Sequence, residues 1–510
     1  MRQKHDTRDG QASPLRALIP LPIRPPAEWP GWAAILALVT LAFAPKLLMI
    51  LLTEAHTGGD SQIYTTVAAN IWQHFCVSLS APESGACVPH WGGNQLPGYP
   101  AFMALVWLLF GRSTEAVLIV QSLVFALAAA RLAWALMALG LRGWWPWLTV
   151  LLLGASPSLI GWSRSVLTET LSAAAALWLL AELILSWHQS RLRILPTALA
   201  FTAGVFLRYD FVLLALPTAV AGFMIHRPVA ALGRGLGIAL IAALAIGAWG
   251  LRSIGHGLPA TPPFGLTLQG EPLPRGMMAW LGTWLDDQYQ LGATVWRLVH
   301  RDYDGFQPPP GAWSDRAERQ RIELLLSRLR AEHQGQAPPP AIDQAFAAEA
   351  SRRSAAQPWR RWLLLPLRRN AKMWLSPYPS MGWPAEIADA ERGAIIDGLR
   401  RRDWPLLIDA VGRNAGAVGA KVMVALDRYA LVLGMLVLVL AAWRRRQGQV
   451  VFAAAMILAL LVARSLLSGY TLLVETRYLV PTLAWLGVAS LLAVASTGQP
   501  AKPPRGDVGP

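Results

Sequence analysis

The stretch WAAILALVTLAFAPKLLMILLTEAHTGGDSQIY, residues 32–64, joins a long apolar run to a polar loop that contains Asp60. The run from Trp32 to Thr53 has the roughly 20 apolar residues that a helix needs to cross the hydrocarbon core of a bilayer. Residues 1–30 are charged and proline-rich and lack the compact apolar core of a cleavable signal peptide, so we expect this run to remain as an anchor. The stretch predicts a membrane protein with a carboxylate at the membrane edge.

The composition of the whole chain agrees with a protein that crosses the membrane many times. Of its 510 residues, 54% are hydrophobic and only 15% are charged. The formal net charge is +15, but the basic residues mostly flank apolar runs, as the positive-inside tendency places them. We therefore expect membrane lipids, and no nucleic acid, as the partner of this charge.

Apolar runs of spanning length predict an all-α fold with about ten transmembrane helices. The stretch Leu195–Ile225 is long enough for a hairpin of two short helices, with the tip at Arg208-Tyr209-Asp210. Gly98–Phe110 has only 13 residues and is expected to lie along the outer surface or to re-enter the membrane. The single spans are predicted at residues 32–53, 115–140, 144–162, 167–187, 234–251, 422–443, 450–467 and 479–495.

The distribution of lysine and arginine between the loops sets the topology. Both termini are expected in the cytoplasm, and the loop that contains Asp60 is expected outside. The expected regions are a cytoplasmic tail (1–31), a catalytic transmembrane module (32–253) with a first external loop (54–114), a large external region (254–421), the last transmembrane helices (422–497) and a cytoplasmic tail (498–510).

Ionisable residues close to apolar runs fall on the predicted outer face. Charges at such positions are costly, so they tend to pair with one another or to mark a functional path. Plainer roles are open as well: Asp60 and Glu169 can cap helices, Arg208 and Asp210 can pair with each other, and arginines can reach lipid phosphates. The residues concerned are Asp60, Arg164, Glu169, Arg208, Asp210, Arg252, Arg464, Glu475, Arg477 and Tyr478.

Together these residues suggest a pocket with carboxylates and guanidinium groups at the external boundary of the membrane. Carboxylates suit a general base or a divalent metal ion, and arginines suit a phosphate. A phosphorylated lipid whose head group is transferred would need both. The only two cysteines, Cys76 and Cys87, lie in the loop with Asp60, where either a disulfide or two free thiols are open.

Five segments resemble the C-type (GT-C fold) membrane glycosyltransferases, in the branch of protein O-mannosyltransferases and lipid A aminoarabinose transferase. Each segment is short, but the five occur in the order of that branch and at matching positions relative to the predicted spans. They are GGDSQIYTTVAANI (58–71), LPGYPAFMALVWLLFG (96–111), ASPSLIGWSRSVLTETL (155–171), LRYDFVLLALP (207–217) and ETRYLVPTLAWLGVASLL (475–492).

The resemblance implies a GT-C-like helix bundle and a polyprenyl-phosphate sugar donor. It places Asp60 and Glu169 as catalytic residues, with a divalent metal ion held by the same two acids as an open alternative. The chain departs from the family at Ser61, where many relatives carry a second acid, which puts metal dependence in doubt. The residues expected to bind the donor phosphate are Arg208, Arg252, Arg477 and Tyr478, and those expected to contact substrate are Tyr64, Gln95, Tyr99 and Asp210.

The predicted function is transfer of a sugar from the lipid-linked donor to an envelope glycan, lipid or protein. The enzyme is expected in the inner membrane with its active site facing the periplasm. The alternatives are a lipid or small-molecule transporter, which would also show charges and broken helices in the membrane, and a scaffold without chemistry. The charges at one face and the lack of a detectable internal repeat favour the transferase.

Overall fold

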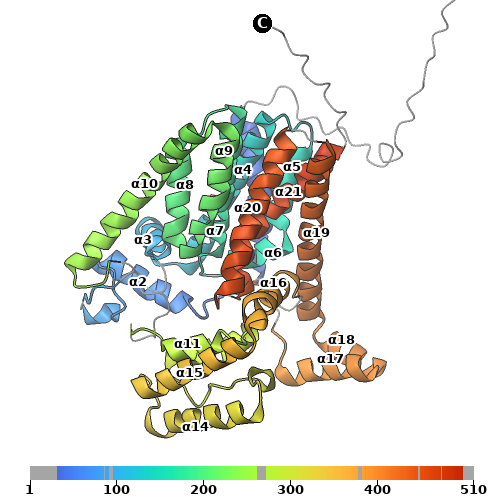
Figure 1. The fold of residues 1–510 in the computed structure, drawn as a ribbon. Helices are drawn as coiled ribbons and strands as arrows, with labels where there is room; N and C mark the ends of the chain where they lie inside the picture. Colours follow the sequence, from blue (N-terminus) through green and yellow to red (C-terminus); the bar gives the residue numbers. More distant parts are fainter. Residues whose placement is uncertain are drawn as a thin grey trace, which may run out of the picture.

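The computed structural model describes residues 31–85, 87–90, 96–260, 271–376, 382–384, 386–445, 448–472 and 474–497. Within these ranges the chain is helical throughout and forms no β-strand. Figure 1 shows a bundle of long helices with a smaller helical layer across one end. We call this end of the bundle the capped end and the opposite end the open end.

Six helices in the described ranges are long and apolar enough to cross a membrane, as a helical membrane protein requires. All six coincide with predicted spans. They are α1 (Gly31–Leu52), α4 (Thr114–Ala138), α7 (Glu169–His188), α10 (Pro228–Gly255), α19 (Ala415–Arg445) and α20 (Gly448–Tyr470).

Shorter helices complete the bundle. The stretch 195–225 forms a hairpin as predicted, with α8 (Ile194–Leu207) and α9 (Ala215–Ile225) joined by a 3₁₀ turn at Tyr209–Leu214. The last helix, α21 (Val480–Thr497), packs against α7 and α19.

The predicted span 144–162 is not one continuous helix. Helix α5 (Trp145–Ala155) ends before Pro157, which has no N–H to continue the hydrogen-bond ladder, and a short helix (α6, Pro157–Ile160) and a 3₁₀ turn follow. Asp427 of α19 accepts hydrogen bonds at this break from Ser156 Oγ at 2.8 Å and Ser158 N at 3.0 Å. The sequence showed the apolar run, but the carboxylate that stabilises the break comes from a distant helix.

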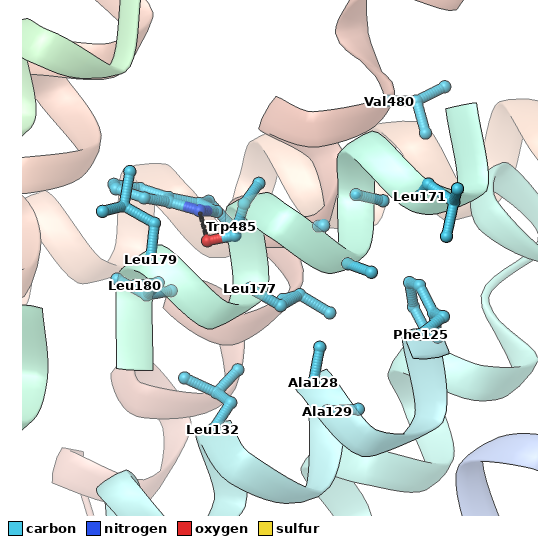
Figure 2. Close-up of a cluster of buried hydrophobic side chains, with 14 of the residues drawn as sticks. Phe125, Ala128, Ala129, Leu132, Leu171, Leu177, Leu179, Leu180, Val480 and Trp485 are labelled. Atoms are coloured by element: carbon cyan, nitrogen blue, oxygen red, sulfur yellow. Dashed lines mark hydrogen bonds between the residues drawn. The ribbon is translucent and has the colours of Figure 1, made fainter. Parts of the chain in front are cut away.

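The centre of the bundle is built by α4, α7 and α21. Small residues of α4, such as Ala128 and Ala129, let α7 approach closely, as in other packed membrane helices (Figure 2). Trp485 of α21 is fully buried and donates its Nε1–H to the carbonyl of Ala176 at 2.8 Å. This core fixes the positions of the helix ends that carry the polar residues.

Two helices of the first loop lie at the capped end. Helix α2 (Ser61–His74) packs against α3 (Gly98–Phe110), whose 13 residues are too few to span a bilayer comfortably. Figure 1 shows α3 nearly end-on, so it runs across the direction of the bundle helices.

The layer at the capped end comprises residues 271–376 and has its own core around Trp280, Phe306 and Phe346. Its helices are α11 (Arg275–Leu281), α12 (Gln288–Ala293), α13 (Val295–His300), α14 (Arg316–Glu332), α15 (Pro340–Ala356) and α16 (Leu365–Leu375). Two further helices, α17 (Asp389–Arg401) and α18 (Trp404–Arg413), form a hairpin beside it and lead into α19.

Arg369 is one of the residues that tie the layer to the bundle. Arg369 of α16 donates to the carbonyls of Gly282 and Leu285 in the layer, at 2.9 and 2.8 Å, and to that of Gly469 in α20, at 2.9 Å. The segment between α20 and α21 also joins the two parts, because Val474 packs in the core of the layer. Three residues later this segment presents Arg477.

Candidate functional site

Asp60 lies at the capped end, immediately before α2, and is 9% exposed. It occupies the N-cap position of α2, but its side chain makes no capping hydrogen bond there. The carboxylate Oδ2 instead accepts from Arg477 Nη1 at 2.8 Å. The capping role that the sequence left open therefore does not account for this residue.

Arg477 connects Asp60 to the segment between α20 and α21. It lies in a 3₁₀ turn (Thr476–Leu479) that precedes α21, and it also pairs with Glu475. Burial lowers the pKa of the Arg477 guanidinium, but the negative charges of Glu475 and Asp60 outweigh burial and raise it. Arg477 therefore carries a fixed positive charge beside Asp60.

Glu169 forms a second acid–arginine pair at the same end. It is the first residue of α7 and 1% exposed, and its Oε1 accepts from Arg208 Nη1 at 2.9 Å. The same Arg208 nitrogen donates to Thr168 Oγ1 at 3.1 Å. In the described part of the chain, Glu169 Oε2 and Arg208 Nη2 are buried without a hydrogen-bond partner. Buried polar atoms of this kind call for an explanation, and a bound substrate would supply one.

Asp210 lies between two arginines at the tip of the α8–α9 hairpin. It accepts from Arg208 Nε at 3.0 Å and from Arg464 Nη1 at 2.7 Å. Arg464 is only 3% exposed, so it does not extend to lipid head groups. The sequence placed Arg464 on the outer face, as an arginine within the apolar run 450–467, but assigned it no role in binding or catalysis.

Tyr478 joins the two acid–arginine pairs. The guanidinium carbon of Arg208 lies 4.7 Å from the centroid of the Tyr478 ring, and that of Arg477 lies 5.6 Å from the same centroid. Burial raises the pKa of Tyr478 to about 12, so the phenol keeps its proton at physiological pH. Asp60, Glu169, Arg208, Arg477 and Tyr478 thus form one cluster, which we call the acid–arginine cluster.

Two tyrosines border this cluster. The rings of Tyr64 and Tyr99 meet edge to face, with 5.2 Å between their centroids. Burial, together with the negative charges of Asp60 and Glu169, raises the pKa of Tyr64. Tyr99 donates to Oε1 of Gln121 at 3.0 Å. Gln121 was missed in the sequence, where a lone amide within the run 115–140 was its only signal.

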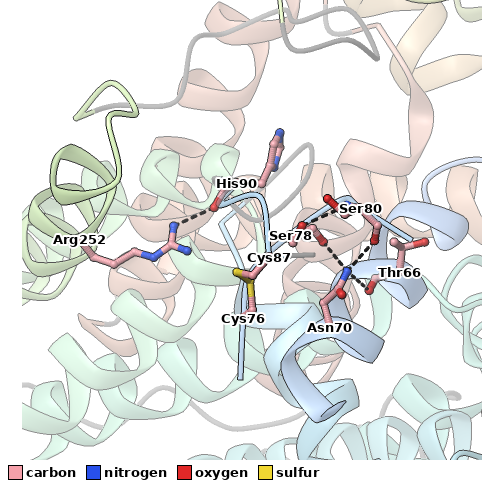
Figure 3. The surroundings of a disulfide bond; sticks show 8 residues. All are labelled: Thr66, Asn70, Cys76, Ser78, Ser80, Cys87, His90 and Arg252. Carbon is pink, nitrogen blue, oxygen red and sulfur yellow. Dashed lines mark hydrogen bonds between the residues drawn. A yellow bond between two sulfur atoms is a disulfide. The ribbon is translucent and has the colours of Figure 1, made fainter. Parts of the chain in front are cut away.

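Arg252 is not brought to the acid–arginine cluster. It donates to the carbonyl of His90 at 2.8 Å (Figure 3). Its guanidinium also lies 4.8 Å from the ring centroid of Trp249. The same loop contains a disulfide between Cys76 and Cys87, whose Cα atoms are 6.1 Å apart. Arg252 therefore holds this loop against α10. Gln95, the remaining predicted substrate contact, lies outside the described residues.

Few ligand side chains for a divalent metal ion surround Asp60 and Glu169 in the described part of the chain, so metal binding stays a prediction. Asp60 and Glu169 are each paired with an arginine, and in the described residues no three His, Cys, Asp or Glu side chains are grouped as metal ligands. The arrangement instead suits an anion such as a phosphate, which could take over the guanidinium groups. In comparisons with known proteins the chain matched no family model, no curated protein and no solved structure.

Proposed function

We propose that the chain is an integral-membrane glycosyltransferase that moves a sugar from a polyprenyl-phosphate donor to an envelope glycan, lipid or protein. The supporting observation is the acid–arginine cluster, in which Asp60 and Glu169 are each paired with an arginine and Tyr478 lies between the pairs. A substrate that carries both a phosphate and a group to be deprotonated would use both kinds of side chain.

The proposed reaction is a single inverting displacement. The acceptor oxygen or nitrogen attacks the anomeric carbon, the bond from this carbon to the phosphate oxygen breaks, and Asp60 takes the acceptor proton. Polyprenyl phosphate leaves with the bonding electron pair. An oxocarbenium-like transition state is expected, as in glycosidases.

The arginines would respond to the donor in a defined way. When the donor phosphate binds, it competes with Asp60 for Arg477 and with Glu169 for Arg208, because both guanidinium groups can bind phosphate oxygens. Release from Arg477 frees the carboxylate of Asp60 to take the proton of the acceptor. Arg464 acts indirectly, because it pairs with Asp210, which in turn pairs with Arg208. No step of this mechanism uses a metal ion.

The bundle supports a topology of ten crossings in the inner membrane. With α5 and α6 counted as one crossing, and the turn Tyr209–Leu214 counted with α9, the other nine are α1, α4, α7, α8, α9, α10, α19, α20 and α21. Helix α3 is left out because it runs across the bundle rather than along it. The open end carries Arg142, Arg191 and Arg227 in loops and Arg444 in the last turn of α19, as expected of the cytoplasmic side. The capped end, with the acid–arginine cluster, then faces the periplasm.

The proposal is tested by Asp60→Asn, with Asp427→Asn as the matched control. Both substitutions remove one carboxylate that accepts hydrogen bonds, but Asp427 stabilises the α5–α6 break rather than the cluster. We expect envelope glycans and lipids of cells with Asp60→Asn to lack one sugar residue by mass spectrometry, as in cells without the gene. Cells with Asp427→Asn keep it.

A measurement of donor binding distinguishes a loss of catalysis from a loss of the folded donor site. Purified Asp60→Asn should still gain thermal stability from a polyprenyl-phosphate sugar and not from a nucleotide sugar. Normal transfer by Asp60→Asn would contradict the assigned base. Movement of the intact donor across the bilayer without transfer would instead identify a transporter.

A further inference from the structure

A cavity lies beside the acid–arginine cluster. It has a volume of about 420 Å³, within the range of small-molecule sites. Its walls combine two indole rings, an imidazole, a guanidinium and a carboxylate. The lining residues are His56, Trp162, Arg164, Gly382, Trp383, Pro384 and Glu386. None of them is used in the proposed transfer reaction.

Backbone pairing connects this cavity to the two acids. His56 N donates to the carbonyl of Arg164 at 2.8 Å, and Val166 N donates to the carbonyl of His56 at 3.1 Å. His56 precedes Asp60 by four residues, and Ser165, its bridge partner, precedes Glu169 by four residues. Because these two segments are paired, the cavity lies at a fixed position next to the carboxylates. The charge of Glu169 influences the pKa of His56, in agreement with this proximity.

The segment that closes the cavity is firmly attached to the bundle. Gly382 has a φ of +83° and lies against the backbone of Gly161, where an added Cβ would come within 2.6 Å of the carbonyl carbon. Trp383 donates its Nε1–H to the carbonyl of Pro157 at 2.7 Å. Arg164 donates to the carbonyls of Gly382 at 3.2 Å and Glu54 at 2.7 Å. The walls are therefore preformed.

The chemistry of the walls selects the ligand. Indole faces offer flat apolar surfaces, and Arg164 and Glu386 together provide donors and acceptors without a large net charge. Trp162 is 8% exposed, and its Nε1–H has no acceptor within the described part of the chain. Sugars have apolar ring faces and a rim of hydroxyl groups, so they match this combination of surfaces.

We infer that this cavity binds a neutral saccharide ring of the acceptor and holds it next to Asp60 for attack on the donor. The role of the saccharide as acceptor rests on the proposed function. Its binding to the cavity does not depend on that function. The cavity is the acceptor subsite, and the acid–arginine cluster is the donor subsite. The preferred acceptor is accordingly a glycan or glycolipid rather than an unmodified protein.

The test measures binding without any donor. The full-length protein in detergent is mixed with methyl glycosides of neutral hexoses and N-acetylhexosamines, and saturation-transfer NMR detects contact. The key variants are Trp383→Ala, which removes one wall, and Trp383→Phe, which keeps an aromatic face. The matched control is Trp362→Ala, because Trp362 lies in the layer, is 59% exposed and does not line the cavity.

We expect saturation transfer to at least one glycoside, at least fivefold weaker in Trp383→Ala and largely kept in Trp383→Phe and Trp362→Ala. Equal signals in wild type and Trp383→Ala, or no signal from any glycoside, would overturn the saccharide subsite. The donor-induced thermal shift serves as the folding check for each variant. Glycoside binding combined with normal transfer by Asp60→Asn would refute the catalytic proposal alone, and transfer without glycoside binding would refute the subsite alone.

Discussion

Asp60 and Asp210 are both buried carboxylates paired with arginine, but they are held differently. Asp210 accepts from two guanidinium groups, those of Arg208 and Arg464, whereas the Arg477 that holds Asp60 is shared with Glu475. A carboxylate held by two cations is stabilised more strongly in its charged form than one that shares a single cation. Asp210 is therefore suited to position Arg208, whereas the Arg477 that holds Asp60 can be taken over by a donor phosphate.

Replacement of Arg477 by lysine tests the donor side of the cluster. Lysine keeps the charge but loses the planar fork that can bind two oxygens at once. We expect the turnover number of Arg477→Lys to fall about 100-fold, the scale for loss of one preorganised donor to a developing anion. The control is Arg413→Lys, which changes an exposed arginine paired with Glu391 and Asp409. Wild-type turnover by Arg477→Lys would remove this arginine from the mechanism.

His56 makes the stability of the capped end dependent on pH. Burial, and then the positive charge of Arg164, lower the pKa of His56 below its ordinary value, against the opposite influence of Glu386 and Glu169. The unfolded chain then binds a proton that the folded protein excludes, so stability falls as the pH drops below about 6.5. We expect the loss of Tm between pH 7.5 and pH 5.5 to be about 1–2 °C smaller in His56→Gln than in wild type. An unchanged or larger loss would contradict this assignment.

At the scale of elements, the first loop is fastened at both sides of its disulfide. Asn70 of α2 donates to the carbonyls of Ser78 and Ser80, at 3.0 and 2.9 Å, and Arg252 holds His90 (Figure 3). The disulfide between Cys76 and Cys87 closes the short loop between these contacts. The loop is thereby kept compact at the C-terminal end of α2, the helix that Asp60 precedes.

Removal of the disulfide should destabilise this element without abolishing the fold. We expect the double variant Cys76→Ser, Cys87→Ser to lose about 2–3 kcal/mol of stability, because a short closed loop restricts the unfolded chain by that amount. Thermal unfolding with and without a reducing agent measures the effect. The reducing agent should lower the Tm of wild type and leave that of the double variant unchanged. Equal Tm values for all four samples would show that the bond does not stabilise the fold.

Arg369 is expected to hold two turns of the layer together and to join them to α20. Its three carbonyl partners lose their donor in Arg369→Met, which should cost roughly 3 kcal/mol. Limited proteolysis should then cut the layer faster, and the Tm should fall. The neighbouring Arg368→Met is the control, because Arg368 is exposed. Similar losses in both variants would contradict a specific role for Arg369.

The helices could be predicted from the sequence more fully than the site could. Spanning length and hydrophobicity are local properties of the chain, so α1, α4, α7 and α20 were placed within a few residues. The break after Ala155 could not be judged from local pattern alone, because Asp427 stabilises it from α19. A run of apolar residues does not show which distant side chain will satisfy an interrupted helix.

The pairing between charged residues could be predicted even less well from the sequence than the helix break. The sequence indicated that Asp60, Glu169 and Arg477 belong to one end of the molecule, but the choice of partners depends on how the helices pack. Arg252 and Arg464 had the same sequence signal, a basic residue within or at the end of an apolar run. Packing directs Arg464 to Asp210 and Arg252 to a loop carbonyl. The spacing of residues along the chain does not show which of these partners an arginine will reach.

At the scale of the whole molecule, the proposed topology requires that all loops of the capped end lie on one side of the membrane. The cluster draws on the segments before α2, before α7, between α8 and α9 and before α21, so an even number of crossings must separate them. Counting α5 and α6 as one crossing and α3 as none satisfies this parity. A crossing by α3 would place Asp60 and Glu169 on opposite sides, which their shared cluster excludes.

Reporter fusions test this parity directly. Alkaline phosphatase, which is active only in the periplasm, should be active when fused after Glu83 or after Glu332 and inactive after Arg142 or after Gln189. Green fluorescent protein fused at the same positions should give the opposite pattern. The pair Glu83 and Arg142 is decisive, because α4 alone should separate them, whereas two crossings by α3 and α4 would place both on one side. Alkaline phosphatase activity after both residues would refute the count of ten and, with it, the common face on which the proposed donor and acceptor meet.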